Sequence, residues 1–219
     1  MSAPIRFYFD FVSPYAYVAW FETLRVAREA GRAVQPTPVL FAGLLRAHGT
    51  LGPAEVPAKR AYVFKDAYRK AHRAGLGPLV PPPSHPFNPL VALRAVAAVD
   101  APEERERLVS ALYRATWAGG GGIEGEARFI AVANDAGLNG PHLAVRAAEP
   151  ATKDRLKANT DEAIARGIFG VPTSVVDDEI FWGVDAIPHL VDRLRGEDPL
   201  PSDLLAQWAD LRATSRRRE

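Results

Sequence analysis

A serine-proline pair at the end of the apolar run in FYFDFVSPYAYVAWFETL is the first place where the sequence could support chemistry. Ser13 suits a helix N-cap, because its hydroxyl can accept a hydrogen bond from a free backbone N–H, and Pro14 suits the first helical position. The N-terminus of a helix also presents free N–H groups and a partial positive charge, which favour an anion. The pair therefore predicts a helix start, and a ligand-binding role for Ser13 stays open.

The composition excludes several classes of site. The chain has 219 residues, a net charge of +1 and no cysteine, so disulfides, thiolate metal sites and cysteine nucleophiles are excluded. The five histidines show no paired metal spacing, and we expect no metal. No basic stripe indicates nucleic acid, and no signal peptide or apolar run of about 18 residues indicates a membrane. We expect a cytoplasmic protein.

The elements around Ser13 follow from the apolar pattern. Residues 5–12 are rich in β-branched and aromatic side chains and predict a strand before the first helix. Residues 33–41 predict a second strand, which two prolines confine to an edge of the sheet. Further along, a helix over 149–167 precedes a hairpin of TSVV and EIFW about a DD turn. Helices in DAIPHLVDRLRG and PLPSDLLAQWADLRA then close the chain.

The middle of the chain is predicted to be helical. Four stretches have helical spacing: VPAKRAYVFKDAYRKAHRAG, LVALRAVAAVD, APEERERLVSALYRATWAG and GEARFIAVANDAG. The order is then β-α-β, helices, α-β-β-α, which predicts an α/β thioredoxin-like fold with an all-helical domain inserted between its halves. We expect 1–41 and 150–219 to form the thioredoxin-like domain and 42–149 the inserted helical domain.

That fold brings a second stretch, GVPT at 170–173, opposite the helix start. Redox members of the fold carry C-x-x-C where this chain has Ser13-Pro14-Tyr15-Ala16, so dithiol exchange is excluded. We expect a cis bond before Pro172, which would turn the N–H and C=O of Val171 outward to pair with an extended peptide. An ordinary strand-entry proline is the alternative.

The segments FDFVSPYAY, GIFGVPTSVV and WGVD, with PAEVPAKRAYVFKDAYR and PFNPLVALRA, resemble the 2-hydroxychromene-2-carboxylate isomerases and the related kappa-class glutathione transferases over nearly the whole chain. The resemblance implies that Ser13 holds the sulfur of glutathione as a thiolate. It implies that Val171 and Pro172 pair with the glutathione backbone and that Val184 and Asp185 reach the γ-glutamyl end. It also implies a small aromatic substrate and a homodimer.

Two positions depart from the family pattern. Thr50 stands where the family usually has asparagine, and it can still donate a hydrogen bond to glutathione. Ala186 stands where an arginine often follows the aspartate of WG-x-D. The loss of that arginine leaves the details of glutathione or carboxylate binding, and the substrate itself, open.

The substrate carboxylate and ring also need partners. Lys59 and Arg60 are candidate cations, with a solvated helix face as the alternative role. Tyr15 and Trp182 are candidates for stacking on an aromatic substrate, with packing as the alternative for each. These four assignments stay open at the level of sequence.

A simple energy comparison shows what Ser13 could do to a bound thiol. A free thiol has a pKa near 8.5 and is only a few per cent thiolate at pH 7. A hydrogen bond to a charged acceptor contributes about 1.5–3 kcal/mol, a helix terminus about 0.3–2, and one pKa unit corresponds to about 1.4. Ser13 and the helix would therefore lower the thiol pKa by on the order of two units.

The reaction that the resemblance implies is the reversible isomerisation of 2-hydroxychromene-2-carboxylate and trans-o-hydroxybenzylidenepyruvate in the breakdown of aromatic compounds. A kappa-type transferase, which conjugates glutathione to electrophiles, would use the same residues. A non-catalytic peptide- or thiol-binding module on a redox-inactive thioredoxin fold is the alternative of another class. The polar Ser13, at a position where alanine would suffice for packing, favours the enzymes.

Overall fold

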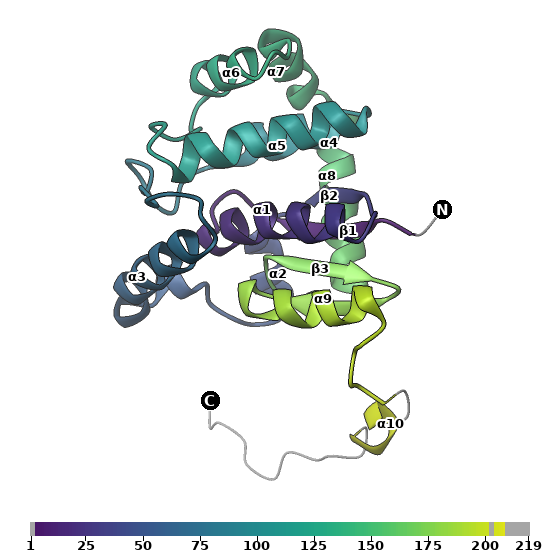
Figure 1. The fold of residues 1–219 in the computed structure, drawn as a ribbon. Helices are drawn as coiled ribbons and strands as arrows, with labels where there is room; N and C mark the ends of the chain where they lie inside the picture. The colour runs from purple at the N-terminus through teal and green to yellow at the C-terminus, as the bar shows by residue number, and fades with distance from the viewer. Residues whose placement is uncertain (1–2, 202–203, 209–219) are drawn as a thin grey trace.

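The computed structural model describes residues 3–201 and 204–208, built around a four-stranded sheet (Figure 1). The strand order is β2-β1-β3-β4, with β1 parallel to β2 and the other two pairs antiparallel. The bounds are Ile5–Phe9 for β1, Val34–Pro38 for β2, Thr173–Val176 for β3 and Glu179–Trp182 for β4. The element order confirms the predicted fold class.

One strand of the sheet, β1, is shorter than the sequence pattern predicts, and β2 lies where it was expected. β1 ends at Phe9 rather than at residue 12, because the Asp10 carboxylate accepts hydrogen bonds from the N–H groups of Val12 and Phe41 and turns the chain. β2 lies at the edge of the sheet, as Pro36 and Pro38 predicted, since neither can donate to a second neighbour.

The hairpin at the other side of the sheet is confirmed. β3 and β4 are joined by Asp177 and Asp178, whose φ angles are 48° and 65°. Positive φ at both positions is the signature of the tight turn whose twist matches that of the two strands.

Helices cover both faces of the sheet. On one face α1 (Pro14–Glu29) and α9 (Ile187–Arg195) enclose an apolar cluster with side chains of β1, β3 and β4. On the other face α2 (Phe41–Ala47) and α8 (Pro150–Ala165) enclose a second cluster around Tyr8 and Val175. The alternation of side chains along a strand separates the two clusters.

The remaining elements lie between β2 and α8 in the chain. They are η1 (Pro53–Glu55), α3 (Pro57–Arg73), α4 (Leu90–Ala98), α5 (Pro102–Trp117), α6 (Glu126–Asp135) and α7 (Gly140–Ala148). In Figure 1, α4 to α7 stack on one side of the sheet and α3 lies beside the start of α1. A continuous apolar core joins α1 with α4 and α5, so the division at 42–149 stays a prediction.

Two helices were not among the predicted stretches. α2 begins at the end of the second predicted strand, and α7 begins behind the N-cap Asn139 with Pro141 in its first turn, where proline is well tolerated. A short helix, α10 (Leu204–Trp208), lies within the last predicted helix. Residues 199–201 of that stretch are not helical, and residues 202–203 and 209–213 fall outside the described residues. No helix in the described residues is long and apolar enough to cross a membrane.

Candidate functional site

Ser13 caps the helix as the sequence predicted. Its Oγ accepts a 3.2 Å hydrogen bond from the N–H of Ala16, and Pro14 occupies the first helical position. The residue is only 7% exposed. Within the described part of the chain the hydroxyl donates no hydrogen bond. Capping uses a lone pair and leaves the hydrogen of the hydroxyl free for an anionic acceptor, so the structural and chemical roles are compatible.

Asp10 fixes the loop that carries Ser13. It is 3% exposed, its Oδ1 accepts from Val12 N at 3.1 Å and its Oδ2 from Phe41 N at 3.0 Å. Its backbone carbonyl accepts from Ser13 N at 3.2 Å. Burial raises the pKa of Asp10 to about 6, although the backbone hydrogen bonds oppose the shift. The sequence reasoning did not assign it, and its signal was a lone acid inside an apolar strand.

The loop before β3 reaches the same end of the sheet. The Val171-Pro172 bond is cis, as predicted. Pro172 O accepts from Gly183 N at 2.9 Å, and Thr173 pairs with Tyr8 in β1. The antiparallel register continues this loop alongside the end of β1, from which the chain runs to Ser13.

The backbone N–H and C=O of Val171 are available for hydrogen bonds to a ligand. The residue is 7% exposed, and neither its N–H nor its C=O is hydrogen-bonded within the described residues. Nearly all buried backbone groups in proteins have a partner. An extended peptide ligand would supply one, which fits the pairing expected from the sequence.

A chain of polar contacts joins the start of α1 to the segment after β4. The Tyr15 hydroxyl donates to Asp66 Oδ2 at 2.9 Å, and Lys70 Nζ lies 3.4 Å from the same oxygen. Lys70 Nζ also donates to Asp185 Oδ1 at 2.7 Å. Burial and the bond to Asp66 raise the pKa of Tyr15, which keeps its hydroxyl protonated as a donor. The structure thus gathers Ser13, Tyr15 and Asp185, which lie far apart in the sequence.

Asp185 and Val184 belong to η2 (Val184–Ala186), which follows the glycine bonded to Pro172. Val184 is partly buried against the core that contains α1. Asp66 and Lys70 were not assigned from the sequence, because only the folded chain brings Asp66 to Tyr15 and Lys70 to Asp185.

His85 is a further neighbour of Ser13 that sequence reasoning did not place there. Its Nε2 lies 2.8 Å from Val12 O, so Nε2 carries the hydrogen. The ring packs against Phe64 and Trp117. Burial lowers the pKa of His85, the bond to Val12 opposes that shift, and the positive charge of Arg60 lowers the pKa further. Arg60 therefore lies within electrostatic range of the loop that leads to Ser13.

The other predicted residues have no direct bond to this group within the described residues. Trp182 is 54% exposed and meets Phe169 edge to face at 5.0 Å. Thr50 and Lys59 are exposed, and Arg60 Nε donates to Ala54 O at 2.9 Å. The structure does not link Thr50 or Lys59 to Ser13 by any contact within the described residues.

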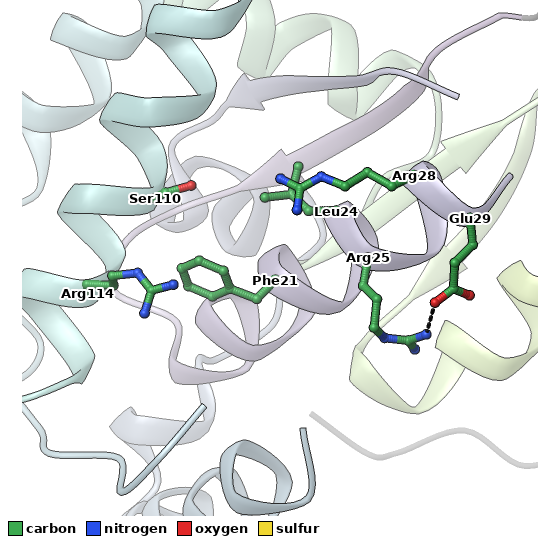
Figure 2. A pocket seen from close by; sticks show the side chains of 7 residues that line it. All are labelled: Phe21, Leu24, Arg25, Arg28, Glu29, Ser110 and Arg114. Atoms are coloured by element: carbon green, nitrogen blue, oxygen red, sulfur yellow. Dashed lines mark hydrogen bonds and ion pairs between the residues drawn. The ribbon is translucent and has the colours of Figure 1, made fainter. Parts of the chain in front are cut away.

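A cavity of about 390 Å³ opens elsewhere, between α1 and α5 (Figure 2). Phe21, Arg25, Arg28 and Arg114 are among its lining residues, and none of the predicted site residues lines it. Arg28 pairs with Glu106 and Arg25 with Glu29, while Arg114 lies over the Phe21 ring. Its arginines are engaged by neighbouring side chains, and the cavity is no part of the candidate site.

No three of the described histidine, aspartate and glutamate side chains come together as a metal-binding group. The polar groups near the end of β1 are hydrogen-bond donors and acceptors, and they lie close to the N-terminus of α1. They suit an extended ligand that carries an anionic atom at Ser13 and charged groups near Asp185.

Comparison with known proteins identifies the family of the chain. A family model described as the DSBA-like thioredoxin domain matches residues 4–195. The chain belongs to that family. The 2-hydroxychromene-2-carboxylate isomerase of Sphingobium xenophagum is 30% identical over 192 residues, which span 87% of this chain and 97% of that protein.

A further relative and a solved structure are similar to the chain over nearly its whole length. Glutathione S-transferase kappa 2 of Caenorhabditis elegans is 28% identical over 206 residues, which span 87% of this chain and 91% of that protein. A solved structure of 2-hydroxychromene-2-carboxylate isomerase superposes with a TM-score of 0.81 at 26% identity, over 95% of this chain and 99% of that one. These relatives place this DSBA-like chain among proteins named as isomerases and transferases.

Proposed function

We propose that this protein is a glutathione-dependent cis-trans isomerase of the 2-hydroxychromene-2-carboxylate type, acting in the breakdown of aromatic compounds. The observation that carries the proposal is the hydrogen bonding of the Ser13 hydroxyl. Its oxygen accepts a hydrogen bond that caps α1, and its hydrogen remains available to an anion at the N-terminus of that helix. The names of the relatives agree with this class of enzyme. Bound glutathione supplies the nucleophile, a thiolate whose reversible addition to a conjugated substrate permits rotation.

The residues of the chain fit glutathione in three places. Ser13 donates its hydroxyl hydrogen to the sulfur, and the dipole of α1 favours negative charge there. Val171 offers its unpaired N–H and C=O to the extended peptide backbone. Val184 and Asp185 face the γ-glutamyl end. Thr50, an exposed donor beyond the end of α2, is the remaining proposed contact.

The substrate is held by groups around this thiol position. The two candidate cations, Lys59 and Arg60, both lie in the first turn of α3. Tyr15 and the exposed Trp182 offer ring faces to an aromatic substrate. The protein would be a homodimer, for which light scattering should give about twice the 23.8 kDa chain mass.

The test separates this activity from its competitors. The protein is incubated with glutathione and the chromene carboxylate, products are separated by chromatography, and free thiol is counted. Isomerised product with an unchanged thiol count supports the proposal, whereas loss of thiol supports the kappa-type transferase named among the relatives. Turnover without thiol overturns both.

Thermal unfolding with and without glutathione tests the binding step separately. A ligand at about 100 times its Kd, bound to the native state alone, adds about 2.7 kcal/mol to the free energy of unfolding. Stabilisation without turnover of any electrophile would instead support a binding module.

A further inference from the structure

The half-buried Lys70 lies beneath an exposed carboxylate in the candidate site. Its Nζ is 2.7 Å from Asp185 Oδ1 and 3.4 Å from Asp66 Oδ2, and it reaches Asp185 across 115 residues of sequence. The side chain of Lys70 is 22% exposed, whereas that of Asp185 is 85% exposed. A cation and an anion therefore stand together at the surface, with the cation the more deeply placed of the two.

The hydrogen-bond capacity of this pair is only partly used. An ammonium has three N–H donors, of which Asp185 and Asp66 engage two. The second oxygen of Asp185, Oδ2, has no partner within the described residues. A free N–H donor on the Lys70 ammonium thus lies beside a free acceptor oxygen on the Asp185 carboxylate. Such a pair can bind the carboxylate and the ammonium of a zwitterion.

We infer that Lys70 and Asp185 together bind the α-amino-acid head of a ligand, with Lys70 taking the α-carboxylate and Asp185 the α-ammonium. The inference rests on the proposed function, in which Asp185 faces the γ-glutamyl end of glutathione, and extends the site to Lys70. Ala186, next to Asp185, brings no charge, and the cation comes instead from the last turn of α3.

The surroundings hold Lys70 ready for this role. Asp66 lies on its other side and is itself fixed by the Tyr15 hydroxyl. Burial lowers the pKa of Lys70, but the hydrogen bonds and attraction of Asp185 and Asp66 raise it overall, so the ammonium stays charged. Because the Asp185 side chain is 85% exposed, its ion pair with Lys70 adds little to stability, so holding the fold together does not account for this arrangement.

The experiment is calorimetric titration with three ligands: glutathione, 4-aminobutanoyl-Cys-Gly, which lacks the α-carboxylate, and glutaryl-Cys-Gly, which lacks the α-ammonium. Lys70→Met should weaken glutathione on the order of tenfold to a hundredfold, the effect of losing a hydrogen bond to a charged group. Lys70→Arg should recover part of the loss. Lys65→Met, at an exposed lysine on the same helix, should bind glutathione within about twofold of the wild type.

The analogues distinguish direct contact from a structural role. The wild type should bind the analogue without the α-carboxylate about as weakly as Lys70→Met binds glutathione, and Lys70→Met should weaken that analogue no further. Glutaryl-Cys-Gly keeps the carboxylate that Lys70 is proposed to bind, so Lys70→Met should bind it more weakly than the wild type does. The wild-type comparison of ligands requires no variant to fold.

Two results would overturn the inference alone. Unchanged glutathione affinity in Lys70→Met, or an equal loss for all three ligands, would remove Lys70 from the ligand contacts while glutathione binding by the wild type stands. No binding of glutathione to the wild type at millimolar concentration would instead overturn the proposed function, and this inference with it.

Discussion

The Tyr15 hydroxyl donates a 2.9 Å hydrogen bond to Asp66 Oδ2 and so fastens the first turn of α1 to α3. Tyr15 follows the capping Ser13 by two residues, and Asp66 lies on the same helix as Lys70. The contact therefore couples the position of the sulfur-binding hydroxyl to the proposed head-group end of the site.

Tyr15→Phe should loosen that coupling. Loss of the hydroxyl leaves Asp66 short of a donor, and we expect about 0.5–1.5 kcal/mol less stability and severalfold weaker glutathione binding. The matched control is Tyr17→Phe. The Tyr17 hydroxyl is buried with no hydrogen-bond partner in the described chain, so its removal should be neutral or slightly stabilising. Chemical unfolding and calorimetry check both, and equal effects of the two variants would contradict the role given to Tyr15.

Ser13→Ala should separate the thiol chemistry from capping. Without the hydroxyl the pKa of the bound thiol should rise by roughly one to two units. The rate near neutral pH should fall about ten- to a hundredfold and recover in part at high pH. Asn139→Ala is the control, since Asn139 caps α7 through a side-chain bond to His142 N. It should lose about 1 kcal/mol of stability and keep the wild-type pH–rate profile. An unchanged profile in Ser13→Ala would leave Ser13 as a cap only.

Asp10 should make stability depend on pH in a direction opposite to that of most carboxylates. Its pKa is raised from 3.8 to about 6 in the folded state, so the folded protein binds the proton more tightly than the unfolded chain. Its contribution is therefore fully present below pH 3.8 and is lost as pH rises through about 6. Relative to Asp10→Asn, the wild type should lose on the order of 3 kcal/mol between pH 4 and pH 7. Urea unfolding at four pH values measures this, and a flat difference would refute it.

Gly170→Ala should disturb the aromatic pair beside the cis-proline loop. A Cβ at residue 170 would lie 2.8 Å from Trp182 Nε1, which is too close for contact. The Trp182 ring, which packs against Phe169, must then shift, at a cost of about 1–3 kcal/mol. In a Trp182→Ala background the same substitution should cost much less, because the obstructing ring is gone. Thermal unfolding of the four variants measures the difference, and additive losses would contradict the contact.

The local parts of the site could be predicted from sequence because their causes are local. The capping of α1 by Ser13, the tight turn at Asp177-Asp178 and the edge position of β2 each follow from the chemistry of adjacent residues. The early end of β1 was missed, because Asp10 ends the strand through a bond to Phe41, which lies on another element.

The rest of the site depends on contacts between distant segments. Nothing in the pattern around Lys70 distinguishes it from the other lysines and arginines of its helix, and its bond to Asp185 exists only once α3 packs against α1. No sequence feature placed His85 near Ser13, but its ring packs against Trp117 and donates a hydrogen bond to Val12 O, which places it beside Ser13. The family resemblance identified Asp185 as a site residue, but it did not indicate that Lys70 pairs with it.

The position of β1 between β2 and β3 has a consequence for how the chain is made. On the ribosome, β1 can pair with β2 as soon as residue 38 has emerged, but its other edge has no partner until Thr173–Val176 have been synthesised. At bacterial or eukaryotic translation rates that interval is on the order of ten to thirty seconds. Throughout it the nascent chain exposes an unpaired aromatic strand edge, the kind of surface that chaperones cover and that truncated chains would retain.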